Sequence, residues 1–135
     1  MAIVVLDTDA ASRLFERRLP ASMLQRLVGQ TPMITFVTIA EAVYGSRSRR
    51  WGARRTTALE QYYQRTFAVL PTRSQHLIPV ARTCGALRAD AEQRGLTVPS
   101  SDAWVASCCI TFGYPLLTLN RKHFEPLAVL GLRLL

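Results

Sequence analysis

The segment IVVLDTDAAS, residues 3–12, decides how the chain folds, because four apolar residues lead directly into two carboxylates. A short run of aliphatic, mostly β-branched residues predicts a strand buried on both faces, as in a parallel sheet. Asp7 then stands at the carboxyl end of that strand, and Asp9 follows two residues later. Thr8 or Asp9 is expected to cap a helix over about 9–18, and the same capping role is an alternative explanation for Asp7.

Outward from this strand, short apolar runs alternate with helical patterns. Strands are expected at 2–6, 32–36, 67–71, 115–119 and, briefly, 131–135. Helices are expected at about 20–29, at 38–45 between a Thr38 N-cap and a Gly45 stop, at 51–66, at 74–94, and from Ser100 or Ser101 to about Gly113. The alternation predicts an α/β fold with a central, mainly parallel sheet of about five strands flanked by helices. The length predicts one domain over 1–135.

The charge of the chain is strongly basic. It holds 17 Lys and Arg against nine Asp and Glu, a net charge of +8, and Lys122 is its only lysine. Since the planar guanidinium matches phosphate oxygens, such a chain suits a nucleic acid, an anionic membrane or an acidic partner. No apolar run reaches the roughly 18 to 20 residues that cross a bilayer, and the first residues lack a signal-peptide layout. We therefore expect a cytoplasmic protein that does not enter the membrane.

Because acids are scarce, their positions are informative. Asp7, Glu41 and Asp102 lie at a strand end or among apolar residues. In a parallel α/β sheet all three are expected at the carboxyl edge of the strands, where ligands bind. Converging carboxylates need a cation, and oxygen ligands suit Mg²⁺ or Mn²⁺, which activate water against a phosphate ester. Alternatively, Glu41 is a half-exposed helix residue and Asp102 an acid favoured by a helix dipole.

Three segments together resemble a known family. VVLDTDAASRLF is similar to the opening strand and D-T-N motif of PIN-domain ribonucleases, and within them of the VapC toxins of bacterial toxin–antitoxin pairs. TFVTIAEAVYGS resembles their second motif, T-x-x-E-x-x-x-G. SSDAWVASCCITFGYPLLTLNRKHF resembles their third block, in which a helix that begins near an Asp leads into a strand and a T-x-N-x-x-D-F ending. The resemblance spans the whole chain and implies the three-layer PIN-like fold.

The resemblance also implies an activity. It indicates an endoribonuclease toxin that depends on Mg²⁺ or Mn²⁺, with Asp7, Glu41 and Asp102 as the acidic triad that holds the metal. Metal-activated water would hydrolyse phosphodiester bonds in structured RNA, such as tRNA or rRNA loops, and leave a 5′-phosphate and a 3′-hydroxyl. A VapB-type antitoxin would bind the toxin, which is expected as a homodimer or in a toxin–antitoxin hetero-oligomer.

The sequence departs from the family pattern at two places. Asp9 stands where the family has Asn, and it is a further possible metal ligand. The family usually carries a fourth acid near its last motif, where this chain has Asn120 and His123. Thr8 and Thr118 are expected to support the carboxylates or contact substrate, as Asn120 and His123 are. Asp9 therefore becomes a candidate replacement for the missing fourth carboxylate.

An arginine cluster is the second candidate binding region. GSRSRRWGARR gathers five arginines around one indole, and these residues are predicted to contact RNA or the antitoxin. A solvated loop between helices, with the indole packed on the core, is the alternative. The cluster consists of Arg47, Arg49, Arg50, Trp51, Arg54 and Arg55.

Two other functions are alternatives to the ribonuclease. LDTDAAS also resembles the opening of haloacid-dehalogenase-type phosphatases, but these need a lysine and a later acidic pair, and Asp102 has no acidic neighbour. A PIN fold that has lost its metal and serves as a non-catalytic RNA- or protein-binding module is the stronger alternative, and the missing fourth acid favours it. The three retained acids favour catalysis.

Overall fold

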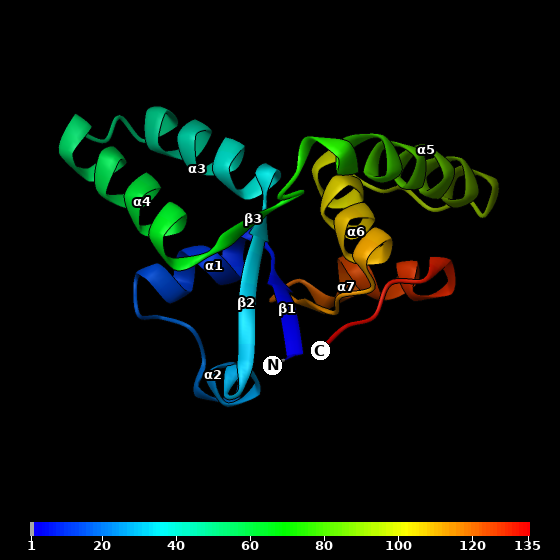
Figure 1. Ribbon diagram of the computed structural model, residues 1–135, viewed down its shortest axis with the longest axis horizontal. Helices are drawn as coiled ribbons and strands as arrows, with labels where there is room; N and C mark the ends of the chain where they lie inside the picture. The colour runs from blue at the N-terminus through cyan, green and yellow to red at the C-terminus, as the bar shows by residue number, and fades with distance from the viewer. Residues whose placement is uncertain (1) are drawn as a thin grey trace.

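A parallel sheet forms the centre of the computed structural model, which describes residues 2–135 (Figure 1). Its strands lie in the order β3-β2-β1-β4, and each neighbouring pair is parallel. The predicted α/β class is therefore confirmed, with four strands in the sheet rather than about five. The strands are β1 (Ala2–Leu6), β2 (Gln30–Thr35), β3 (Ala68–Leu70) and β4 (Leu116–Leu117).

The fifth strand predicted at 131–135 is reduced to one isolated bridge. Leu134 pairs with Leu116 in parallel, and the Leu116 N–H donates to the Arg133 carbonyl at 2.9 Å. Because β4 spans only two residues, it offers this segment too short an edge for a regular ladder.

Helices cover both faces of the sheet, as Figure 1 shows, with α1, α3 and α4 on one side and α5, α6 and α7 on the other. No helix within residues 2–135 has both the length and the hydropathy to span a membrane. The helices are α1 (Thr8–Phe15), α2 (Ala21–Leu27), α3 (Phe36–Ser48), α4 (Ala53–Thr66), α5 (Leu77–Gln93), α6 (Ser100–Phe112) and α7 (Arg121–Phe124), with 3₁₀ turns η1 (Ser74–His76) and η2 (Glu125–Leu130).

Two apolar cores flank the sheet and make the three layers expected from the resemblance. Val4 and Leu6 face one core, which α1, α2 and α4 complete with buried residues such as Tyr63. Val5 faces the other core, under α5 and α6. Successive residues of a strand point to opposite faces, so the buried run of β1 supplies both cores at once. This double burial fixes the position of the strand that ends at Asp7.

Helix α3 differs from its prediction at both ends. It begins directly after β2, where the Thr35 hydroxyl accepts the Val37 N–H at 3.2 Å, and it runs through Gly45 to Ser48. The predicted cap, Thr38, is instead buried inside the helix. Both predictions were wrong because Thr35 offers a cap one turn earlier and Gly45 keeps a helical conformation. As a result, α3 forms one continuous wall from Glu41 to the arginine cluster.

The chain order places a switch point beside β1. The strands β2 and β3 extend the sheet on one side of β1, and the chain then returns to add β4 on the other side. In open α/β sheets such a reversal leaves a crevice at the carboxyl ends of the strands, and ligands bind there. The two residues that follow these strand ends are Asp7 and Thr118.

Candidate active site

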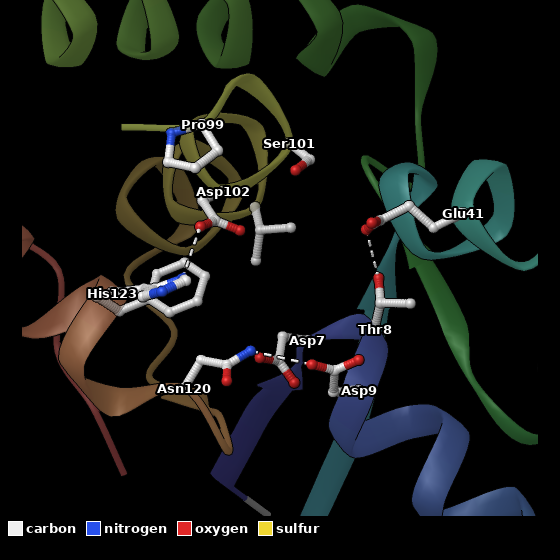
Figure 2. Close-up of a pocket in the computed structure, with 11 residues that line it drawn as sticks. Asp7, Thr8, Asp9, Glu41, Pro99, Ser101, Asp102, Asn120 and His123 are labelled. Carbon is white, nitrogen blue, oxygen red and sulfur yellow. Dashed lines mark hydrogen bonds and ion pairs between the residues drawn. The ribbon is translucent and has the colours of Figure 1, made fainter. Parts of the chain in front are cut away.

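A cavity of about 260 Å³ opens at this switch point, and the predicted carboxylates surround it (Figure 2). The residues come from the end of β1, from α1, α3 and α6, and from the segment after β4. Thr118 lies just below, in contact with Asp7. The cavity is lined by Asp7, Thr8, Asp9, Glu41, Pro99, Ser101, Asp102, Val105, Asn120, His123 and Phe124.

Asp7 is held rigidly at the bottom of the site. One carboxylate oxygen accepts the Ala10 N–H at 2.9 Å and so caps α1, while the other accepts the Thr118 hydroxyl at 2.5 Å. The Thr118 Oγ1 in turn accepts the Asn120 N–H at 2.9 Å. Burial raises the pKa of Asp7 to about 6, against the lowering effect of these hydrogen bonds, and the charges of Asp9 and Asp102 add to the rise. Asp7 thus caps α1, as the sequence suggested, and also lines the cavity.

Glu41 projects from α3 on the opposite side of the cavity from Asp102 (Figure 2). Its Oε1 accepts the Thr8 hydroxyl at 2.7 Å, and the Thr8 and Thr38 hydroxyl oxygens lie 3.1 Å apart. Sequence reasoning assigned Thr38 to a helix cap and missed this contact, which depends on the packing of α1 against α3. The hydroxyl pair fixes one carboxylate oxygen and leaves the exposed side chain facing the cavity.

Asp102 stands in the first turn of α6, as predicted, with Pro99 at the N-cap position in place of the expected Ser100 or Ser101. Its Oδ2 lies 3.6 Å from the His123 Nδ1. Burial raises the pKa of Asp102, while the neighbouring His123 lowers it. His123 is largely exposed and thus contacts the carboxylate from the rim of the cavity.

Asp9 and Asn120 meet across the lower part of the site. The Asn120 Nδ2 donates to the Asp9 Oδ2 at 2.9 Å, which joins the first turn of α1 to the loop after β4 (Figure 2). Residues 111 positions apart are involved, so no local pattern in the sequence predicts the bond. The two departures from the family pattern, Asp9 and Asn120, are therefore direct partners.

The donor set fits a hard divalent cation. Four carboxylates face one cavity, and within residues 2–135 none of them forms an ion pair with an arginine or lysine. In the same residues no three acidic, histidine or cysteine side chains stand together at metal-binding spacing. Mg²⁺ commonly keeps several waters and takes only one or two carboxylates directly, so an open carboxylate cavity of this kind suits it. The four are Asp7, Asp9, Glu41 and Asp102.

The arginine cluster is divided by the fold. Arg49, at the end of α3, lines a hollow next to Asp9, and Trp51 lines the same hollow. The Arg55 guanidinium covers the Trp51 ring at 3.6 Å from its centroid, and all five arginines of the cluster are exposed. Trp51 packs against the apolar core beside α4, as in the packing alternative, and it is only partly buried. Its contact with RNA or the antitoxin stays a prediction.

A four-stranded parallel sheet with carboxylates around its switch point defines a class of α/β proteins that bind ligands at the carboxyl ends of the strands. A family model described as PIN domain matches residues 4–129. The chain belongs to the PIN domain family.

Named relatives agree with this assignment. The chain is 24% identical over 131 residues to Ribonuclease VapC1 of Methanocaldococcus jannaschii, covering 97% of this chain and 85% of that protein. It is 25% identical over 130 residues to VapC ribonuclease Y4jK of Sinorhizobium fredii, covering 91% of each. The fold is similar to the structure of VapBC-1 from nontypeable Haemophilus influenzae, with a TM-score of 0.80, 19% identity, and coverage of 98% of this chain and 96% of that one.

Proposed function

We propose that the chain is the toxin of a VapBC toxin–antitoxin pair and acts as an endoribonuclease that requires Mg²⁺ or Mn²⁺. The observation that carries this is the set of four carboxylates that faces one cavity without arginine or lysine partners in residues 2–135. Two relatives named as VapC ribonucleases support the reaction class. The similar VapBC-1 structure supports a VapB-type antitoxin as partner. The chain is proposed to form a homodimer or a toxin–antitoxin hetero-oligomer.

Each acid has a proposed role. Asp7, directly after β1, and Asp102, in the first turn of α6, would hold the cation with help from Glu41 and Asp9. A divalent cation, when bound, makes water a better nucleophile and neutralises charge that develops on the phosphate. The Thr8 hydroxyl fixes one oxygen of Glu41. The other oxygen would be free to accept a hydrogen bond from the attacking water. Thr118 keeps Asp7 oriented.

The substrate is proposed to be structured RNA, with loops of tRNA or rRNA as the class, and the chain is proposed to act as one PIN domain. Hydrolysis would leave a 5′-phosphate and a 3′-hydroxyl. The net charge of +8 favours a polyanionic substrate, because it raises the local concentration of the polyanion near the cavity.

The two competing functions find less support. Lys122, the only lysine, lines a neighbouring hollow that shares Pro99 and His123 with the cavity, but it does not line the cavity itself. It is therefore not placed to assist a phosphatase reaction at Asp7. The non-catalytic alternative depended on a missing fourth acid, whereas Asp9 supplies a fourth carboxylate to the cavity.

Cleavage of total RNA by the purified chain tests the proposal. With Mg²⁺ or Mn²⁺ we expect discrete fragments that carry 5′-phosphates, and we expect EDTA to prevent them. Asp7→Asn and Asp102→Asn should each abolish cleavage, while Asp90→Asn, which removes an exposed acid on α5, should retain it. Cleavage that survives both active-site changes would contradict the proposal, as would RNA binding without cleavage in either metal.

A further inference from the structure

A groove leaves the carboxylate cavity and runs between α1 and α3. The groove consists of the cavity and two further hollows that adjoin it in sequence. The cavity and the second hollow share Thr8, Asp9 and Glu41. The second and third hollows share Asp9, Ser12 and Arg49. Figure 2 shows its entrance, where Thr8 and Asp9 on α1 face Glu41 on α3.

The two walls of the groove have the same helical spacing. Thr8, Ser12 and Glu16 mark one face of α1, and Glu41, Gly45 and Arg49 mark the facing side of α3, each at intervals of four residues. Side chains four apart lie on the same side of a helix, so these residues form two parallel rows. The groove therefore has a defined direction, away from the carboxylates and toward the ends of both helices.

Small residues keep this groove open. Ser12, Ala42 and Ser46 line it, and a Cβ added at Gly45 would meet no atom within 4 Å. The buried Leu59 and Tyr63 complete the lining. The groove is thus unobstructed next to Gly45 of α3.

The far end of the groove is basic. A hollow of about 290 Å³ there is lined by Arg13, Arg18 and Arg49 together with Asp9 and Glu16. Arg18 pairs with Glu16 at 3.6 Å, whereas Arg13 and Arg49 form no ion pair within residues 2–135. Two unpaired guanidinium groups facing one polar hollow are suited to a single phosphate group.

We propose that this groove is the path of the RNA strand beside the scissile bond, and that Arg13 and Arg49 bind one neighbouring phosphate. The proposal rests on the proposed ribonuclease function and adds a binding site outside the carboxylate cavity. Arg13 lies one helical turn beyond Asp9, about 6 Å along α1. This distance from the cavity fits a neighbouring phosphate of the same RNA strand. The far hollow is lined by polar and charged side chains alone, and its arginines complement the charge of a nucleic-acid backbone.

Binding without cleavage tests the site independently of the reaction. The probe is a fluorescein-labelled single-stranded oligouridylate, titrated by anisotropy against the full chain carrying Asp7→Asn in EDTA. On this background, Arg13→Gln with Arg49→Gln should weaken binding about tenfold or more and reduce the slope of log K against log salt by about 0.7, the value for one phosphate contact. The charge-matched control is Arg82→Gln with Arg88→Gln, two exposed arginines on α5.

A second variant tests the path without changing charge. Gly45→Leu should fill the groove and weaken binding of the oligouridylate several-fold, whereas Gly85→Leu on α5 should not, although a Cβ at either glycine meets open space. Because Leu favours a helix more than Gly does, both variants are expected to fold.

The outcomes separate the possibilities. The proposal would be overturned if both double arginine variants lost the same affinity for oligouridylate. It would also be overturned if Gly45→Leu and Gly85→Leu bound the oligouridylate equally well. Poly-L-glutamate serves as a second probe, which stands for an acidic protein. If the Arg13→Gln and Arg49→Gln variant lost binding of poly-L-glutamate but kept binding of oligouridylate, the surface would belong to an acidic protein and the proposal would be overturned. If the native chain cuts no RNA but the arginine and leucine variants behave as expected, the ribonuclease proposal fails and the phosphate site stands.

Discussion

At the scale of single residues, Asp7 combines requirements that oppose one another. It is 5% exposed and caps α1, yet in the proposed function it must carry a charge to hold a cation. In the metal-free chain, ionising this carboxylate costs free energy because burial removes its hydration. The Ala10 N–H and the Thr118 hydroxyl offset part of that cost. The ionised form of Asp7 is therefore less favourable in the folded chain than in water.

This conflict predicts a pH-dependent stability. The pKa of Asp7 is about 6 in the folded chain, against an ordinary value of 3.8, so the folded chain binds the proton more tightly. The protonated Asp7 carboxyl contributes fully to the free energy of unfolding below about pH 4. This contribution, about 3 kcal/mol at most, is lost as the pH rises through 6. Asp7→Asn in EDTA should therefore be more stable than the native chain at pH 7 and gain nothing at pH 4, measured by urea unfolding.

Asp90→Asn is the control for this measurement, because Asp90 is exposed on α5. It should change the free energy of unfolding by less than about 0.5 kcal/mol at either pH. A less stable Asp7→Asn chain at pH 7 would show that the hydrogen bonds outweigh the cost of burial.

The contact between Asp9 and Asn120 predicts that the two positions are interchangeable. Asp9→Asn should weaken Mn²⁺ binding roughly tenfold, because the cavity loses one of its four carboxylates. Adding Asn120→Asp restores a carboxylate and an amide in reversed order, so the double variant should recover most of the affinity. Calorimetric titration measures both steps. No recovery in the double variant would mean that the carboxylate is needed on α1 itself.

At the scale of helices and strands, glycine positions predict stability with opposite signs. Gly113 ends α6 at φ +72°, and the Tyr114 N–H returns to the Cys109 carbonyl at 2.9 Å. Gly113→Ala should cost about 1–2 kcal/mol, since a Cβ disfavours the left-handed region. Gly85→Ala, inside α5 with open space around its Cβ, should gain up to about 1 kcal/mol. Thermal or urea unfolding checks both variants. Stability changes of the same sign would contradict the roles given to these two glycines.

The sequence predicts the elements that have strong local signals and misses those set by contacts. The apolar run of β1 and the polar pattern of α4 lie close to their predicted bounds. The end of α3 was misplaced because Gly45 resembles a stop, although the helix continues to Ser48. The turns after β4 were not predicted, since α7 has four residues and no clear period.

At the scale of the whole molecule, the cavity lies between the two halves that flank the sheet. Asp9 and Glu41 belong to elements on the α1 and α3 side, while Asp102 begins α6 on the other. The sequence predicted which acids meet, because strand ends and helix starts share one edge of a parallel sheet. It could not predict the hydrogen bonds from Thr8 to Glu41 or from Asn120 to Asp9, which depend on how the halves pack.

This placement predicts that a divalent cation stabilises the whole molecule. A ligand that binds only the folded chain adds about 2.7 kcal/mol at 100 times its dissociation constant. Mn²⁺ should therefore raise the melting temperature of the native chain, and hydrogen exchange should slow in both α1 and α6, because the cation joins acids from the two sides. Asp7→Asn with Asp102→Asn should lose this effect, and Asp90→Asn should keep it. Equal stabilisation of the double variant would place the cation away from the cavity.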